Sequence, residues 1–290
     1  MERLRKPGQG VGNIVRFNWH FYVLALALLG GLASLRAGAG PALRPYADAL
    51  LLLVAGPTLV SLLVSAYVYD TSNLYALDWL PDLPAAAPDP AAAPAAAVPD
   101  PAAAATAPHP AAAAALAAAA EAGPARLVNI NAGFDETSVL LAHRFPGAGL
   151  TVLDFYDPAV HTEVSIRRAR AAYPPYPGTR RVAAGQLPLP AGSCQRVFLF
   201  MAAHEARQPA QRVALLREVG RLLLPGGQAV VVEHLRDLPN FLAYTVGFLH
   251  FYSGREWRRV FRAAGLVVAR EQKITPFVSA FTLVRDGNPR

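Results

Sequence analysis

Two long apolar segments near the N-terminus constrain the fold of this chain more than any other feature. Residues 17–35 contain His20 as the only side chain that titrates near neutral pH, and residues 49–69 contain no charged side chain. Each segment is about long enough to cross a hydrocarbon core of roughly 30 Å. Neither has the polar stripe of a surface helix in a water-soluble protein. We therefore predict a membrane anchor made of two transmembrane helices.

A cleaved signal peptide is the alternative for residues 17–35. The segment lacks a clear small-x-small cleavage site and a second apolar segment follows it directly, so we prefer the hairpin. Positive charge is more frequent before the hairpin than in its turn: Arg3, Arg5, Lys6 and Arg16 against Arg36 and Arg44. Because basic flanks favour the cytoplasmic side, we expect the N-terminus and the C-terminal domain to be cytoplasmic, at a bacterial-type inner membrane.

The segment after the hairpin, residues 70–83, mixes large apolar side chains with acidic ones. It is predicted to lie along the lipid headgroups or to pack against the globular domain. Residues 84–123 are dominated by alanine and proline, which predicts an extended or disordered linker, with a helix over 111–122 leading into the domain. The chain is thus divided into an anchor (1–83), a linker (84–123) and a domain (124–290).

Composition excludes several functions. The net charge is +7, but the chain has no basic run with interleaved aromatic residues, so we do not expect it to bind nucleic acid. Cys194 is the only cysteine, which rules out an intrachain disulfide and a thiolate zinc cluster. It is expected to be a packed thiol. The seven histidines show no metal-ligand spacing, so no metal site is predicted.

From residue 126 onward, short apolar runs alternate with amphipathic stretches. The runs that suit buried parallel strands are 126–130, 150–156, 180–184, 196–202 and 228–235. The stretches that suit helices are 136–145, 162–173, 209–223 and 254–265. Two further runs, 266–274 and 277–286, are joined by Thr275-Pro276 and suggest a terminal hairpin. The pattern predicts an α/β fold with a Rossmann-like doubly wound sheet and a C-terminal antiparallel hairpin.

Three features of the region 124–286 resemble class I S-adenosylmethionine (SAM) methyltransferases. Residues 221–227, RLLLPGG, followed by the run QAVVVE, are similar to the family's helix, turn and fifth strand. The paired C-terminal runs are similar to its antiparallel seventh strand. Residues 185–205, GQLPLPAGSCQRVFLFMAAHE, are similar to its loop into the fourth strand. The resemblance implies SAM as the cofactor.

The resemblance also implies which residues would contact the cofactor. The family's acid and glycine-rich loop correspond to Asn129, Asn131 and Gly133, with Gly133 as the only glycine of the motif retained. Asp154 stands at the position that binds the ribose hydroxyls, with Asp157 as its competitor. Gln186 would approach the adenine, and Met201 and Ala202 would line the cofactor pocket.

Candidate bases follow the ends of predicted strands, where open α/β sheets bind ligands. We rank His204 and His234 first as catalytic candidates, ahead of His161, Glu205 and Glu233. The apolar, aromatic segment 240–253 would cover the substrate, dock on the bilayer, or pack as a core helix. Together with the anchor, it favours a hydrophobic, membrane-associated acceptor such as a lipid or a quinone-like molecule. Nothing in the sequence indicates the oligomeric state.

Two other functions stay open at this stage. The altered glycine loop is compatible with a degenerate methyltransferase fold that serves as a non-catalytic membrane scaffold. A nicotinamide-dependent oxidoreductase would also have Rossmann-like strands, but its G-x-G-x-x-G motif is missing.

Overall fold

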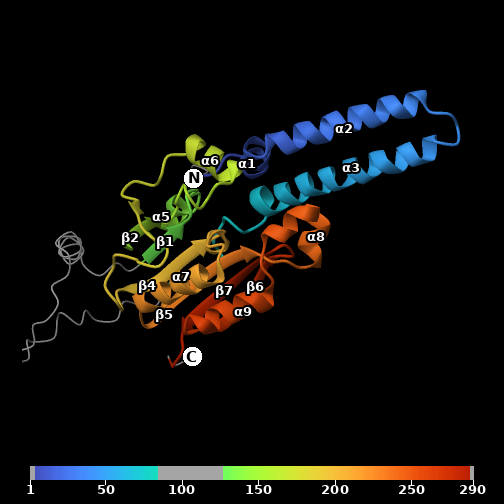
Figure 1. Cartoon of the computed structure of the whole chain (residues 1–290). Helices are drawn as coiled ribbons and strands as arrows, with labels where there is room; N and C mark the ends of the chain where they lie inside the picture. Colours follow the sequence, from blue (N-terminus) through green and yellow to red (C-terminus); the bar gives the residue numbers. More distant parts are fainter. Residues whose placement is uncertain (1–3, 84–126, 288–290) are drawn as a thin grey trace, which may run out of the picture.

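A computed structural model describes residues 4–83 and 127–287 of the chain. The predicted linker and the helix predicted over 111–122 lie outside these residues. The domain is built on a seven-stranded sheet with the strand order β3-β2-β1-β4-β5-β7-β6 (Figure 1). The strands are β1 (Leu127–Asn131), β2 (Leu150–Asp154), β3 (Arg180–Arg181), β4 (Cys194–Phe200), β5 (Leu223–His234), β6 (Leu266–Thr275) and β7 (Val278–Arg285).

The pairing confirms the α/β fold and the C-terminal hairpin. Strands β1 to β5 pair in parallel, whereas β7 lies antiparallel to both β5 and β6. The helices of the domain are α5 (Ser138–Arg144), α6 (Val164–Ala172), α7 (Pro209–Leu222), α8 (Leu238–Tyr244) and α9 (Gly254–Ala263). Strand β5 begins five residues earlier than the predicted run because the LPGG turn is itself part of the strand.

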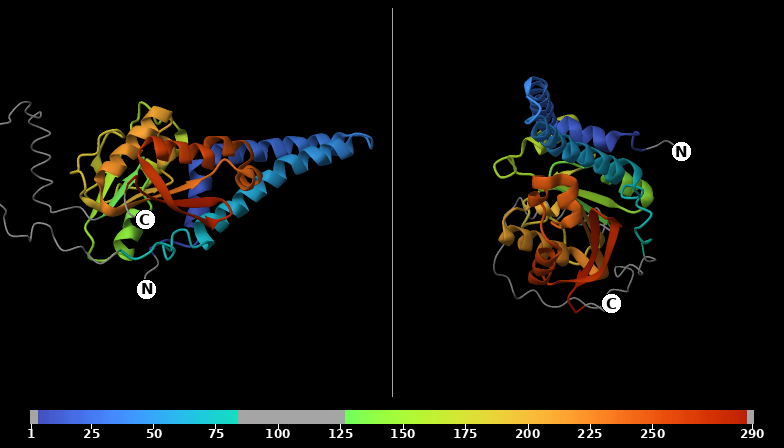
Figure 2. Two further views of the ribbon diagram at one scale, coloured as in Figure 1. Left: turned by 90° about the horizontal axis from the view of Figure 1, so that it is seen from below. Right: turned by 90° about the vertical axis from the view of Figure 1, so that its right-hand side faces the viewer.

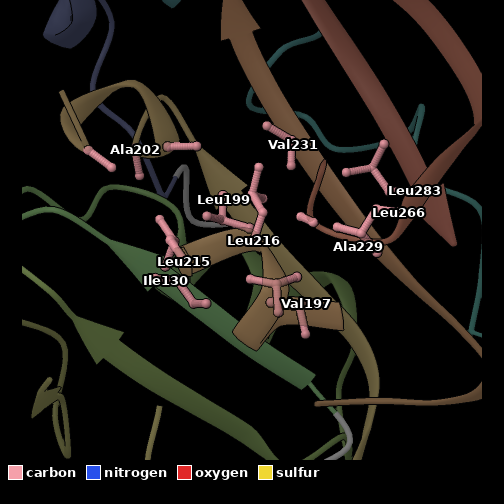
Figure 3. Close-up of a cluster of buried hydrophobic side chains, with 14 of the residues drawn as sticks. Ile130, Val197, Leu199, Ala202, Leu215, Leu216, Ala229, Val231, Leu266 and Leu283 are labelled. Atoms are coloured by element: carbon pink, nitrogen blue, oxygen red, sulfur yellow. The ribbon is translucent and has the colours of Figure 1, made fainter. Parts of the chain in front are cut away.

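Side chains alternate between the two faces of the sheet, as expected for a strand buried on both sides. Val197 and Leu199 of β4 belong to a core with Leu215 of α7 and Trp257 of α9 (Figure 3). Phe198, between them in the sequence, faces the opposite way, into a second core formed with helix α5. Both faces of the sheet are therefore covered.

The segment after the apolar hairpin completes that second core. Leu74, Leu77 and Leu80 are each 1% exposed and pack in the same cluster as Phe198. The buried guanidinium of Arg196 holds the end of the segment by donating to the carbonyl oxygen of Pro81 at 2.6 Å. Of the two alternatives left open for residues 70–83, the structure thus shows packing against the domain.

The N-terminal region forms helices α1 (Gln9–Phe17), α2 (Trp19–Gly38) and α3 (Arg44–Ala66), followed by the π-helix η1 (Tyr67–Thr71). Helices α2 and α3 form a hairpin that projects from the domain (Figure 2). Helix α2 has no buried residue, and the continuous helix 44–71 is nearly as exposed. By length and composition, both helices could cross a membrane. The described hairpin therefore includes both predicted apolar segments, with boundaries shifted by a few residues.

Helix α1 was not predicted and turns the N-terminus back onto the domain. The carboxylate of Asp70 in η1 accepts hydrogen bonds from the backbone amides of Gly10 and Val11, at 2.6 and 2.8 Å. A side chain at Gly10 would collide with Tyr69, because its Cβ would lie 2.4 Å from the Cβ of Tyr69. The close contact fixes α1 beside the last turn of the apolar hairpin.

Candidate functional site

A pocket of about 240 Å³ lies where the carboxyl ends of β1 and β4 meet helix α1. The sheet side contributes the loop residues Ala132 and Phe134 and the strand-end residues Phe200, Met201 and Glu205. The N-terminal region contributes Asn13, Phe17, Asn18, Tyr69 and Tyr75. This edge of a parallel sheet is where open α/β folds bind ligands. The pocket is therefore the candidate active site.

The N-terminal wall of the pocket is held by Glu136. Its carboxylate accepts from the side-chain amide of Asn13 at 2.9 Å and from the hydroxyl of Tyr75 at 3.2 Å, and it pairs with Arg5 at 3.0 Å. The guanidinium of Arg5 also lies 3.8 Å from the centre of the Tyr75 ring. Sequence reasoning missed this wall because the N-terminus and the strand-end loops are more than 120 residues apart.

The loop after β1 is tied together by its own polar side chains. Asn129 is buried and donates to the hydroxyl groups of Thr137 and Ser138, at 3.0 and 2.8 Å. Asn131 accepts from the amide of Gly133 at 3.0 Å, and Gly133 adopts a φ of 100°, which favours glycine. None of these three residues lines the pocket: Asn129 supports the loop, and Asn131 and Gly133 shape the turn.

Asp154 lies at the end of β2, as predicted, but its carboxylate is already paired. The guanidinium of Arg170 from helix α6 lies 2.7 Å from Oδ2 of Asp154 and donates to the carbonyl of Gly133 at 3.2 Å. Arg170 also stacks on Tyr156, 4.3 Å from the ring centre. The space beside Gly133 is filled by these two side chains, which would lie 2.8 and 2.9 Å from a Cβ placed there.

The other predicted cofactor residues differ in their placement. Met201 lines the pocket, with a φ of 47° that turns the chain sharply at the end of β4. Ala202 is buried in the core behind the pocket. Gln186 is exposed in the loop after β3 and does not line the pocket.

His204 lies in the 3-10 helix η3 (Ala203–Glu205), between two carboxylates. Its Nδ1 lies 2.7 Å from Oε2 of Glu233 and its Nε2 lies 3.2 Å from Oε1 of Glu205. Burial alone would lower the pKa of His204, but the carboxylates of Glu233 and Glu205 raise it to about 10. The imidazole is therefore held in one orientation, and Glu205 connects it to the pocket.

A second histidine closes the same cluster. His250 ends the 3-10 helix η4 (Thr245–His250), and its Nε2 lies 3.9 Å from Oε1 of Glu205. Its ring packs edge-on against that of His204, with centres 5.1 Å apart. Arg207 contacts the His250 ring and pairs with Glu163 at 2.8 Å. Although Glu205 had been considered as a base, its meeting with His250 was not predicted, because the two are 45 positions apart.

Arg212 of helix α7 positions the turn that carries this cluster. Its buried guanidinium donates to the carbonyl oxygens of Ala206 and Arg207, at 2.9 and 2.8 Å. It also pairs with Glu256 at 2.9 Å and lies over the ring of Tyr252. These contacts fix the backbone directly after Glu205.

His234 is held by hydrogen bonds outside the pocket, so its ranking as a catalytic base gains no support from the structure. Its Nε2 accepts from the hydroxyl of Tyr69 at 2.7 Å, and its Nδ1 lies 2.9 Å from the carbonyl oxygen of Phe277. The ring stacks on Phe251, and His234 is absent from the pocket lining. Burial lowers its pKa to about 4, so both ring nitrogens serve as neutral hydrogen-bonding groups.

His161 and Asp157 form a closed turn of their own. The amide of Asp157 donates to Nδ1 of His161 at 2.9 Å, and the carboxylate of Asp157 accepts from the amide of Ala159. The His161 ring stacks on Tyr156. Asp157 is thus a turn residue, and Asp154 is the carboxylate that faces the β1 loop.

The polar side chains at the ends of β1 and β2 are of the kind that could bind part of SAM. Among the described residues, Nδ2 of Asn131 and Oδ2 of Asp135 are buried without a hydrogen-bond partner, so the β1 loop has polar atoms left for a ligand. Asp154 does not line the pocket. Its carboxylate would be available to vicinal hydroxyls only if Arg170 turned away. The cavity of about 240 Å³ is smaller than the roughly 300–1,000 Å³ of most ligand pockets.

No protein-family model and no curated protein matches the chain. Solved structures match at low identity. LepI in complex with SAM aligns over 58% of this chain and 44% of its own, at 16% identity and a TM-score of 0.43. Geranyl diphosphate C-methyltransferase from Streptomyces coelicolor aligns over 60% of this chain and 79% of its own, at 15% identity and a TM-score of 0.40. A SAM-dependent methyltransferase from Methanosarcina mazei aligns over 57% of this chain and 93% of its own, at 15% identity and a TM-score of 0.42. The aligned part is less than half the length of LepI.

The strand order decides the fold. Seven strands in the order 3-2-1-4-5-7-6, with only the seventh antiparallel, define one arrangement among the doubly wound sheets. The fold is that of class I SAM-dependent methyltransferases.

Proposed function

We propose that this protein transfers a methyl group from SAM to a hydrophobic, membrane-associated small molecule, such as a lipid or a quinone-like compound. One observation carries the choice of acceptor. The pocket beside the cofactor edge is lined by Phe17 and Asn18, directly before helix α2, and by Tyr69, at the end of the apolar span. An acceptor in this pocket lies at the foot of the apolar hairpin.

The pocket and the strand-end residues beside it would have different roles. The loop 131–135 and Asp154 would hold SAM, whose sulfonium supplies an activated methyl group. Phe17, Phe134 and Phe200 give the acceptor an apolar surface, and Glu205 provides a carboxylate at the polar end. Methyl transfer requires alignment and exclusion of water more than covalent help, and the wall that α1 adds to the pocket would contribute to both.

The proposed location is a membrane, with the domain on the cytoplasmic side. The two exposed apolar helices of 20 and 28 residues support a spanning hairpin, and the basic flank of the first helix supports the orientation.

The test is a titration of the full chain, in detergent micelles, with SAM and S-adenosylhomocysteine. The full chain is needed because Asn13 and Tyr69 are part of the pocket wall. We expect saturable binding that Asp154→Ala abolishes. Methyl transfer is then assayed with radiolabelled SAM and extracted membrane lipids, and label in the organic phase identifies the acceptor class.

A non-catalytic membrane scaffold is the second candidate, because Arg170 occupies the carboxylate that would bind ribose. Absence of SAM binding by a folded protein, in the wild type and after removal of the Arg170 side chain, would support the scaffold.

A further inference from the structure

The cluster beside the pocket brings together three potential metal ligands. His204, Glu205 and His250 each offer one ligand atom, and the three atoms lie within 4.8 Å of one another. Oε1 of Glu205 lies 3.2 Å from Nε2 of His204 and 3.9 Å from Nε2 of His250. Donor atoms about 2.0–2.2 Å from one ion lie roughly 3–4 Å from each other, so small side-chain movements would bring all three onto a single ion.

Both histidines have a carboxylate at their other ring nitrogen. Oε2 of Glu233 lies 2.7 Å from Nδ1 of His204. Oε1 of Glu163 lies 3.4 Å from Nδ1 of His250, and Arg207, which pairs with Glu163, contacts both nitrogens of that ring and would have to move for an ion to bind. In metal sites, the histidine nitrogen that does not bind the ion usually donates to a carboxylate, which fixes the tautomer and the ring orientation. Here both Nε2 atoms are directed toward the carboxylate of Glu205.

Formal charge also favours a cation. Glu163, Glu205 and Glu233 carry three negative charges, and Arg207 contributes one positive charge against them. An ion would displace the proton that these carboxylates stabilise on His204. With both imidazoles then neutral, two negative charges remain, and a divalent ion would balance them. Glu233 itself is an unsuitable ligand, since its two oxygens already accept from Nδ1 and from the backbone amide of His204.

We propose that His204, Glu205 and His250 bind a divalent transition-metal ion of the zinc type. Two imidazoles and one carboxylate suit such an ion and leave further coordination positions open. Glu205 also lines the pocket, so an open position would face the acceptor. There the ion would hold a hydroxyl oxygen of the acceptor and make it more acidic. That role rests on the proposed methyl transfer, whereas ion binding does not.

The ion is tested directly on the full chain in detergent micelles, with any affinity tag removed and without SAM. Co²⁺ is followed by its visible absorption, and Zn²⁺ by equilibrium dialysis. We expect one ion per chain, and loss of saturable binding in His204→Gln, Glu205→Gln and His250→Gln. Glu233→Gln should weaken binding about 10–100-fold, as for other carboxylates that orient a ligating histidine.

Two further variants sharpen the result. His143→Gln alters an exposed histidine of α5, outside the cluster, and should bind Co²⁺ as the wild type does. Arg207→Met should bind Co²⁺ more tightly, because its guanidinium competes for the carboxylates of Glu163 and Glu205. Near-ultraviolet circular dichroism confirms that each variant is folded.

The proposal is overturned if the folded wild type binds no ion saturably, or if the three ligand variants bind as the wild type does. Weaker binding by Arg207→Met would overturn it too, because the charge argument would then be wrong. A separate SAM titration keeps the two proposals apart: ion binding without SAM binding leaves the metal site and removes the methyl transfer.

Discussion

The hydroxyl of Tyr69 donates to Nε2 of His234 at 2.7 Å and thereby joins the end of the apolar hairpin to the end of β5. His234 is buried and Tyr69 is partly buried, and Nδ1 of the His234 ring donates to the carbonyl oxygen of Phe277. The hairpin and the domain are thus coupled through one neutral histidine. His234 lies at a strand end, where catalytic residues are often found, but here it links the apolar hairpin to the domain.

Tyr69→Phe should destabilise the protein by about 1–3 kcal/mol, because it leaves Nε2 of His234 buried without a partner. The measurement is denaturant unfolding of the full chain in micelles, followed by tryptophan fluorescence. Tyr67→Phe is the matched control, since Tyr67 is half-exposed and its ring contacts Phe277 only at its edge. Equal stability of the two variants would show that the hydrogen bond contributes nothing to the free energy of unfolding.

Stability should also fall as the solution becomes acidic. The folded pKa of His234 is about 4, below the ordinary histidine value of about 6.5, so the unfolded chain takes up a proton that the folded chain refuses. The contribution is complete above pH 6.5 and is lost as the pH falls toward 4. It amounts to about 3 kcal/mol. Unfolding free energies measured across this range should slope downward, and His234→Gln should flatten that slope; an unchanged slope would contradict the assignment.

Arg170→Gln should bind SAM about tenfold more tightly than the wild type. The substitution frees the carboxylate of Asp154 from a charge-assisted hydrogen bond of roughly 1.5–3 kcal/mol. Calorimetric titration measures the change, and Arg167→Gln, an exposed position on the same helix, is the control. Weaker or equal binding by Arg170→Gln would show that Arg170 does not compete with the cofactor.

Most of the fold could be predicted from the sequence because each buried strand is a short apolar run between amphipathic stretches. The final pair of runs, joined at Thr275-Pro276, correctly predicted the antiparallel end of the sheet. The sequence did not predict whether residues 74–80 pack against the sheet or lie against lipid. An apolar segment after a hairpin suits lipid and protein equally, and only the second core beside Phe198 decides between them.

The site was predicted less completely, for a physical reason. Strand ends are local features, so Asp154, Met201 and His204 could be placed at the correct edge of the sheet. The contacts of these side chains depend instead on tertiary packing. Asp154 pairs with Arg170 only because helix α6 packs beside β2, and Glu136 holds the pocket wall only because helix α1 packs back onto the domain. No local pattern in the sequence encodes either contact.

Cys194 should react slowly with thiol reagents in the folded protein. It is fully buried at the start of β4, and burial raises the pKa of its thiol to about 11, so little thiolate is present at neutral pH. Labelling should become rapid only in denaturant, as measured by mass spectrometry after timed quenching. Fast labelling under native conditions would mean that β4 opens locally.

The last prediction concerns an exposed apolar face formed by α8 and η4. It contains Leu238, Phe241, Leu242, Val246 and Leu249, which are between 45% and 79% exposed. Helix α8 packs against α3, so this face lies beside the apolar hairpin (Figure 1). Such a contiguous patch is uncommon on a protein surface surrounded by water alone. We expect the face to enter the lipid interface beside the hairpin.

A dye on one introduced cysteine can test whether the α8–η4 face enters the lipid, because Cys194 stays unlabelled. Val246→Cys, carrying an environment-sensitive dye and reconstituted in vesicles, should fluoresce at shorter wavelength and be quenched by nitroxide-labelled lipids. Arg258→Cys, on the exposed side of α9, is the control and should be quenched by a water-soluble agent instead. Equal quenching of both positions by the water-soluble agent would place the α8–η4 face in solvent. The bilayer would then contact the hairpin alone, and an acceptor would have to reach the pocket along α2 and α3.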